Sequence, residues 1–269
     1  MGKLYKTIGD ISAEMRGRNI SAYAASIAFF FFLSVVPMLI LICTILPYTT
    51  LTEENLLTAL TDLMPDMVDP LIKSVVEDVY NRSAGILSVA AVATVWSAAK
   101  GVMALMQGLN VVNEVEDTRN YFVIRAIASF YTLVMLVVVV LSLFLMVFGD
   151  QLVNLALHRI PRMQAVVSFA MNFRFILVWA ILTVLFAAIY AYVPDRKLKF
   201  REQIPGAVFS AVVWSVFSWG FSLHVTYGNS YGIYGSLAII IIVLLWLYFC
   251  MYIILIGACL NRHFHPDGQ

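Results

Sequence analysis

Long apolar runs separated by short charged segments dominate the chain. A helix needs about 20 apolar residues to cross a bilayer. The hydrocarbon region offers no water to bond to the backbone. A single segment there can pair all of its N–H and C=O groups only as a helix. The pattern therefore predicts an all-α, polytopic membrane protein whose transmembrane domain covers residues 19–261. Its six expected crossings are residues 21–48, 85–110, 126–148, 173–193, 204–226 and 235–260.

Two amphipathic segments are expected outside the bilayer core. Apolar residues recur at helical spacing among lysines and arginines in residues 1–18, which is typical of an interfacial helix lying on the membrane surface. Residues 53–82 also keep one apolar face, and Pro65 and Pro70 divide them. We expect a short extracytoplasmic helical pair there.

The distribution of basic residues predicts the orientation of the chain. Six crossings place both termini on the same side, and cytoplasmic segments carry an excess of Lys and Arg. With the N-terminus inside, the extracytoplasmic segments hold fewer basic residues than the cytoplasmic ones. We therefore expect an N-in/C-in topology with a cytoplasmic tail at residues 262–269. The cytoplasmic basic residues would be Lys3, Lys6, Arg16, Arg18, Arg119, Arg125, Arg196, Lys197, Lys199, Arg201 and Arg262.

Composition narrows the function. The 269 residues are 62% hydrophobic and 12% charged, with a net charge of +1, whereas soluble domains carry about 25% charged residues. The charge gives no basic field for nucleic acid. Cys43, Cys250 and Cys259 lie in apolar runs, which favours neither a disulfide framework nor a zinc site. No phosphate loop, catalytic triad or metalloprotease helix occurs, so we expect no catalytic residues, no metal, no cofactor and no enzymatic activity.

Lys100 is the most conspicuous candidate for function, because it lies inside an apolar crossing. A lysine at the centre of a membrane helix costs roughly 2.5–3.5 kcal/mol on insertion scales. With residue 85 outside, Lys100 lies about 22 Å inward at 1.5 Å per residue, in the cytoplasmic half of the membrane. It either serves a function there or extends its ammonium group to the nearby head groups. The sequence leaves both readings open.

The candidate site extends along one helix face. Helical spacing places Trp96, Ser97, Lys100 and Gln107 on one mildly polar stripe, and polar stripes in membranes face protein or water. Asn110 is a further polar neighbour near the end of the crossing. We therefore predict that Lys100, Ser97, Gln107 and Asn110 bind substrate. Basic residues at the cytoplasmic surface are candidates for contacts with acidic lipid, namely Arg125, Arg196, Lys197, Lys199 and Arg201.

Four stretches of the chain carry a family resemblance. They are YAASIAFFFFLSVVPMLIL, VWSAAKGVMALMQGLNVVNEVEDTR, PGAVFSAVVWSVFSWGFSLHV and YGSLAIIIIVLLWLYFCMYIILIGACLN. In order and spacing they resemble the YihY/BrkB family of bacterial inner-membrane proteins, formerly mislabelled as ribonuclease BN. The resemblance implies six membrane helices, a multi-pass location in the bacterial plasma membrane and a role in moving a lipid-like envelope component.

The resemblance also marks individual residues. The family pattern of the second crossing matches Trp96, Ser97, Lys100 and Gly101, and its later positions match Asn110, Arg119, Pro205 and Gly206. The family's terminal pattern of glycine, alanine and glutamate followed by asparagine matches Gly257, Ala258 and Asn261, which makes Asn261 a candidate for gating or head-group contact. Cys259 stands at the glutamate position, so a mechanism that uses that acid is in doubt for this chain.

These observations predict a transporter or flippase for an amphipathic, anionic, lipid-like envelope component, with membrane lipids as partners and no nucleic acid. The alternative is a membrane scaffold that organises envelope partners without transporting anything. The sequence is compatible with a homo-oligomer.

Overall fold

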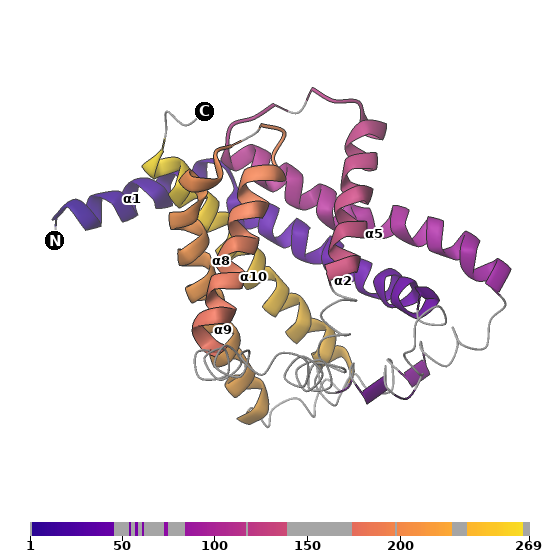
Figure 1. Ribbon diagram of the computed structural model, residues 1–269. Helices are drawn as coiled ribbons and strands as arrows, with labels where there is room; N and C mark the ends of the chain where they lie inside the picture. The colour runs from indigo at the N-terminus through magenta and orange to yellow at the C-terminus, as the bar shows by residue number, and fades with distance from the viewer. Residues whose placement is uncertain are drawn as a thin grey trace, which may run out of the picture. The chain divides into compact units, whose positions relative to one another are not determined.

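The computed structural model describes residues 2–45, 54, 57–58, 61, 73–74, 84–116, 118–138, 174–196, 198–227 and 236–265. Over these residues the chain is helical, with no strand. The main helices are α1 (Gly2–Gly17), α2 (Ile20–Ile45), α5 (Ala84–Val112), a helix at Tyr121–Val138, α8 (Arg174–Tyr192), the short 3-10 helix η3 (Phe200–Gln203), α9 (Ile204–Tyr227) and α10 (Ser236–Phe264) (Figure 1).

The described helices confirm a multi-pass membrane protein in outline. Three are long and apolar enough to cross a bilayer, namely Tyr121–Val138, Phe200–Val225 and Ile240–Phe264. A fourth span results if Gly9–Gly17 and Ile20–Val35, which are bent by 62° at their junction, count as one. The six-span count and the N-in/C-in orientation stay predictions. Most of the expected extracytoplasmic segment, residues 53–82, lies outside the described residues.

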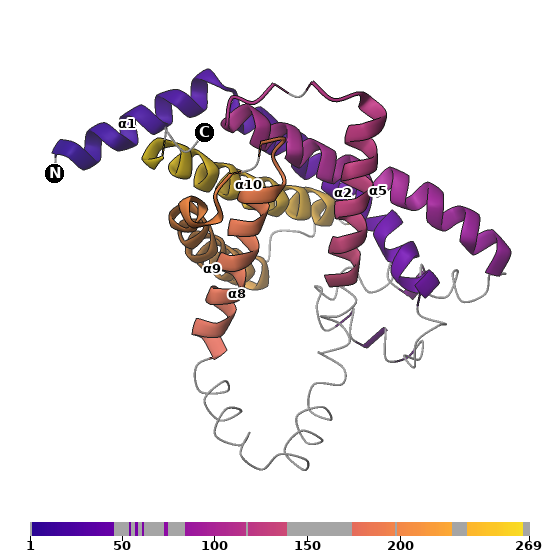
Figure 2. The ribbon, with the colours of Figure 1, turned by 45° about the horizontal axis from the view of Figure 1, so that its top comes forward.

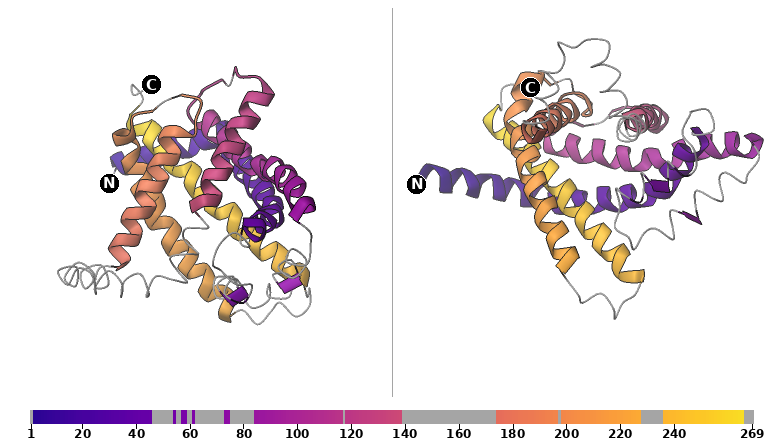
Figure 3. Two further views of the ribbon diagram at one scale, coloured as in Figure 1. Left: turned by 45° about the vertical axis from the view of Figure 1, so that its right-hand side comes forward. Right: turned by 60° about the horizontal axis from the view of Figure 1, so that its bottom comes forward.

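The chain forms two compact units. Unit 1 comprises Met1–Phe32, Gly101–Ile124 and Phe175–Gln269, and unit 2 comprises Leu33–Lys100 and Arg125–Arg174. In unit 1 the C-terminal end of α10 lies beside α1 (Figure 2). The helices α9 and α10 pack against each other (Figure 3). The candidate residues are therefore divided between two units.

The core of unit 1 lies between α2, α5 and α10. Ile27, Leu109 and Leu255 are completely buried there. Gly108 faces them: a Cβ at this position would lie 3.0 Å from Ile27 Cδ1 and 3.4 Å from Leu255 Cδ2. A small residue thus allows the helix backbones to approach closely, as is common between membrane helices.

A polar group links α8 to the α9–α10 pair inside unit 1. The Tyr190 hydroxyl lies 2.7 Å from Ser210 Oγ and donates to the Ile254 carbonyl oxygen at 2.8 Å. Tyr190 and Ser210 are buried, and a buried hydroxyl without a partner would be costly. These bonds therefore fix how the three helices pack.

Local signals explain where two helices begin. Asn19 adopts a positive φ of 53° between α1 and α2, a conformation that asparagine tolerates better than most residues. Its carbonyl oxygen accepts the amides of Ala22 and Tyr23. Asn120 caps the helix Tyr121–Val138, because its Oδ1 accepts the Phe122 amide at 3.3 Å. This helix starts before residue 126, where the third crossing was expected.

Candidate functional site

Three members of the predicted polar stripe lie on the exposed surface of α5 within unit 2. Trp96 is 46% exposed, and Ser97 and Lys100 are exposed as well. Among the residues that the structure describes, no carboxylate forms an ion pair with Lys100. Lys100 is therefore available to an anion from outside the described part of the protein.

Arg125 lies beside this stripe and is buried. It belongs to the helix Tyr121–Val138 and is 1% exposed. Its Nη2 donates to the Trp96 carbonyl oxygen, and its guanidinium carbon lies 5.0 Å from the centre of the Trp96 ring. Cations attract the face of an indole at this distance. Its Nε and Nη1 atoms have no hydrogen-bond partner among the residues that the structure describes, so the guanidinium group is only partly satisfied there.

Gln107 and Asn110 belong to unit 1 and differ in their surroundings. Gln107 is exposed. Asn110 is buried, and its Oδ1 accepts the backbone amide of Asp195 at 2.9 Å. Asp195 in turn forms an ion pair with Arg119 at 2.9 Å. Asn110 thus connects α5 to the segment that follows α8, and its role as a substrate ligand stays a prediction.

Asn261 is likewise held by the backbone. Its Oδ1 accepts the Gly206 amide at 2.6 Å, and its Nδ2 donates to the carbonyl and side-chain oxygens of Gln203 at 3.0 and 3.1 Å. A Cβ at Gly206 would lie 2.0 Å from the Gly257 carbonyl oxygen. The family-pattern residues Gly206, Gly257 and Asn261 therefore meet where the start of α9 crosses α10.

The predicted basic loop is solvent-facing where it is described. Arg196, Lys199 and Arg201 are exposed, and Lys197 lies outside the described residues. Lys199 pairs with Glu202 at 3.1 Å. An exposed pair of this kind contributes little to stability, so Lys199 can exchange Glu202 for another anion. All three exposed side chains can therefore contact a charged surface.

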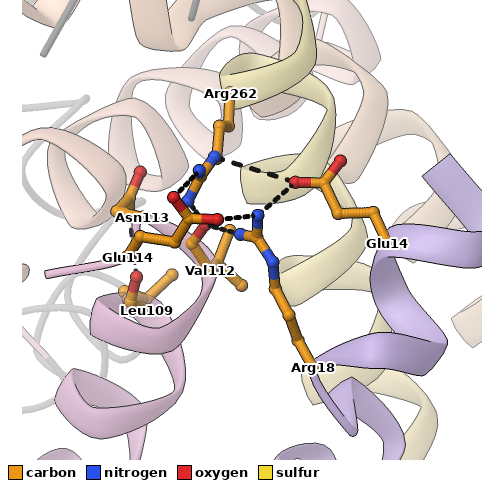
Figure 4. Close-up of polar contacts among 7 residues, drawn as sticks. All are labelled: Glu14, Arg18, Leu109, Val112, Asn113, Glu114 and Arg262. Carbon is orange, nitrogen blue, oxygen red and sulfur yellow. Dashed lines mark hydrogen bonds and ion pairs between the residues drawn. The ribbon is translucent and has the colours of Figure 1, made fainter. Parts of the chain in front are cut away.

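An ionic cluster at the end of α5 was not predicted. It joins Glu14, Arg18, Glu114 and Arg262 from three separate segments of unit 1 (Figure 4). Arg18 Nη2 lies 2.7 Å from Glu14 and 2.5 Å from Glu114. Arg262 pairs with Glu114 and, at 3.7 Å, with Glu14. The hydrogen bond from Arg262 and the charges of both arginines lower the pKa of Glu114 below its ordinary 4.5.

Cys259, at the position of the family's acid, lies near this cluster. Its side chain is completely buried, and it precedes Arg262 of the cluster by three residues in α10. The thiol adds no formal charge to the cluster. Over the described residues, no group of three His, Cys, Asp or Glu side chains is placed to hold a metal ion.

Comparisons with known proteins agree with the resemblance. A family model described as virulence factor BrkB matches residues 11–267. The ribonuclease-like protein YfkH of Bacillus subtilis is 31% identical over 244 residues, which is 90% of this chain and 89% of that protein. A UPF0761 membrane protein of Idiomarina loihiensis is 42% identical over 79 residues, or 29% of this chain and 28% of the relative. A UPF0761 membrane protein of Vibrio vulnificus is 40% identical over 74 residues, or 27% and 24%. No solved structure matches.

Proposed function

The chain belongs to the virulence factor BrkB family of bacterial membrane proteins, and from this premise we propose that it is a transporter or flippase for an amphipathic, anionic, lipid-like envelope component. We also propose that it is not an enzyme. Its molecular partners in this proposal are membrane lipids, and its substrate is an anionic amphiphile that exchanges between the lipid and the protein.

The observation that carries this proposal is the position of Lys100. It is an exposed cation on an apolar helix, with no described carboxylate as its partner. A charge in a membrane segment is stabilised by water, by a counter-ion or by the head-group region. An anionic amphiphile supplies a counter-ion for the lysine and an apolar tail for the surrounding hydrocarbon. The exposed Ser97 beside it adds a hydroxyl that donates or accepts hydrogen bonds.

The exposed basic residues of unit 1 support a route to the membrane surface. Arg196 and Arg201 are not tied to described acidic side chains. Basic residues near an anionic leaflet contribute about 1 kcal/mol each to lipid attraction. In this proposal they concentrate acidic amphiphiles near the protein, and Lys100 selects the anionic group.

Reconstitution into liposomes tests this function. The rate at which a fluorescent phosphatidic acid changes leaflet is measured for the wild type, Lys100→Met, Lys100→Arg and the control Lys73→Met, which removes an exposed lysine elsewhere. We expect Lys100→Met to slow exchange by about tenfold or more, since a hydrogen bond to a charged group contributes about 1.5–3 kcal/mol. Lys100→Arg keeps most of the rate, and Lys73→Met leaves it unchanged. Wild-type protein no faster than empty liposomes would contradict transport and favour the scaffold.

A further inference from the structure

We propose that Arg125, Lys100 and Trp96 form a binding site for a phosphate head group, with Trp96 as its cover. This inference rests on the proposed function and names the class of anion that the transporter selects. All three residues belong to unit 2, and the observation that requires an explanation is the incompletely bonded guanidinium group of Arg125.

Arg125 has donors to spare in a buried place. An arginine carries five N–H donors, one on Nε and two on each Nη. Nη2 is bonded to the Trp96 carbonyl oxygen, whereas Nε and Nη1 are buried and have no partner in the described part of the chain. Their three N–H bonds therefore lack an acceptor from these residues. Burying a charge that is not fully hydrogen-bonded is expensive, and an anion that accepts these donors would remove that cost.

The described part of unit 2 offers no carboxylate for this purpose. Its one acidic residue, Glu54, is exposed and makes no ion pair with Arg125. The dipole of its own helix does not stabilise the charge of Arg125 either. It lies one turn after the helix begins at Tyr121, where the helix dipole favours negative rather than positive charge.

Lys100 is placed to share the same anion. In an α-helix the carbonyl group of residue i points towards the amide of residue i+4, so Arg125 contacts the turn of α5 between Trp96 and Lys100. Side chains at i and i+4 lie on the same face and lean towards the N-terminus of the helix. The side chain of Lys100 therefore leans back towards Trp96 and the guanidinium group beneath it. In this proposal two cations from different segments bind one anion.

The donor set favours a phosphate over a carboxylate. Arg125 offers three unpaired N–H groups, and a lysine ammonium offers three more with a second positive charge. A carboxylate presents two oxygens and one negative charge. A terminal phosphate presents three oxygens and a charge between −1.5 and −2 at neutral pH, by analogy with phosphorylated side chains. It therefore satisfies more donors and balances both cations.

Trp96 controls access to the site. Its ring covers the guanidinium group, while nearly half of its own surface is exposed. Rotation of the indole about its side-chain bonds uncovers the unpaired donors next to Lys100. The cation–π contact holds the site closed without ligand, and the anion replaces that contact with charge-assisted hydrogen bonds.

Ligand binding to the full chain in detergent tests the site. Affinities are measured by calorimetry for a short-chain phosphatidic acid, for decanoate as a carboxylate amphiphile, and for inorganic phosphate. The variants are Arg125→Met, Arg125→Lys, and Lys73→Met as a control that removes an exposed basic residue elsewhere. We expect wild type to prefer the phosphatidic acid over decanoate by about tenfold or more. Arg125→Met loses that preference, and Arg125→Lys, which keeps the charge but fewer donors, retains part of it.

The melting temperature without ligand separates binding from a structural role. Since Arg125 is buried and incompletely bonded, Arg125→Met should melt at the wild-type temperature or above it. A lower melting temperature with unchanged affinity would assign Arg125 a purely structural role and overturn the site. If Arg125→Met does not fold, Arg125→Lys with wild-type preference overturns it equally.

The ligands and assays also distinguish the remaining outcomes. Phosphate bound as tightly as phosphatidic acid identifies a free anion as the ligand rather than a lipid head group. Equal affinity for decanoate and phosphatidic acid contradicts phosphate selectivity while leaving Lys100-dependent exchange intact. Phosphate-selective binding without leaflet exchange contradicts the transporter and retains the site.

Discussion

Arg18 and Arg262 donate to the same atom, the carbonyl oxygen of Val112 at the end of α5. The neighbouring carbonyl groups already have partners. The Val115 amide bonds to the Asn110 carbonyl oxygen and the Glu114 amide to that of Val111, which is the Schellman arrangement at a helix end. Cations at a helix C-terminus also interact favourably with the helix dipole. The two arginines thus complete the cap and connect the α1–α2 junction and α10 to α5.

Replacing Arg262 should therefore destabilise unit 1. Arg262→Met removes the bond to Val112 and the pairs with Glu114 and Glu14. It should cost about 2 kcal/mol, as expected for hydrogen bonds that involve a charged group. Thermal unfolding in detergent measures the loss, and Arg196→Met, an exposed arginine, is the control. Equal melting temperatures for the two variants would contradict a role of Arg262 in the cap.

Glu114 should make stability depend on pH. Its pKa is lowered in the folded protein, chiefly by the hydrogen bond from Arg262. The folded protein therefore binds the proton less readily than the unfolded chain, so the stabilisation is complete above the ordinary pKa of 4.5 and disappears as the pH falls through the lower folded value. The side chain is 61% exposed, which limits the effect to about 1 kcal/mol or less.

Comparison of wild type with Glu114→Gln tests this dependence. The melting temperatures should differ at pH 7, and the difference should shrink below about pH 4. Glu116→Gln is the control, because Glu116 lies in the same loop, is exposed and has no described ion pair. If the difference in melting temperature stays constant from pH 7 to pH 3, the effect arises from the shape of the Glu114 side chain rather than from its charge. Glu114→Gly tests the backbone strain at this position separately, since glycine adopts the observed φ of 51° without strain.

Gly206 should tolerate no larger residue. A Cβ there would lie 2.0 Å from the Gly257 carbonyl oxygen and 2.6 Å from Asn261 Oδ1. Because one of these atoms belongs to the backbone of α10, α9 and α10 would have to move apart. Gly206→Ala should cost about 1–3 kcal/mol or more, measured by thermal unfolding. Gly220→Ala in the same helix is the control, since nothing lies within 4 Å of its Cβ. A Gly206→Ala variant as stable as Gly220→Ala would show that the crossing is not tightly packed.

Hydrophobic runs located the helices well, because burial in lipid acts on each segment separately. The predicted crossing at 204–226 corresponds to α9, Ile204–Tyr227. The helix Tyr121–Val138 begins before residue 126, where the third crossing was expected, and Arg125 is buried against Trp96. The bounds of the third crossing and the contact of Arg125 with lipid head groups stay predictions. The capping residue Asn120 was the local signal for the earlier start.

The sequence could predict only the part of the candidate site that lies on a single helix. Periodicity predicted that Trp96, Ser97 and Lys100 share one face of α5, and all three side chains are exposed; whether that face meets water, protein or lipid stays a prediction. The approach of Arg125 to Trp96 depends on tertiary packing, which periodicity does not reveal. The same is true of the bond between Asn110 and the Asp195 amide, which engages a residue predicted to bind substrate. The cluster of Glu14, Arg18, Glu114 and Arg262 joins three segments, and the positive φ of Glu114 has no signal in its residue type.

The orientation of the chain decides whether Lys100 lies in the cytoplasmic half of the membrane. The distribution of basic residues predicts Arg201 on the cytoplasmic side and Arg82 on the outer side. Single cysteines at these positions, in a Cys43→Ser background, report the side through an impermeant maleimide, because Cys250 and Cys259 are buried. In right-side-out vesicles Arg82→Cys should react at once, and Arg201→Cys only after permeabilisation. The reverse pattern would invert the topology and place Lys100 nearer the outer surface. If both positions react without permeabilisation, residue 201 lies outside. That result would contradict the even number of crossings predicted between the cytoplasmic N-terminus and residue 201.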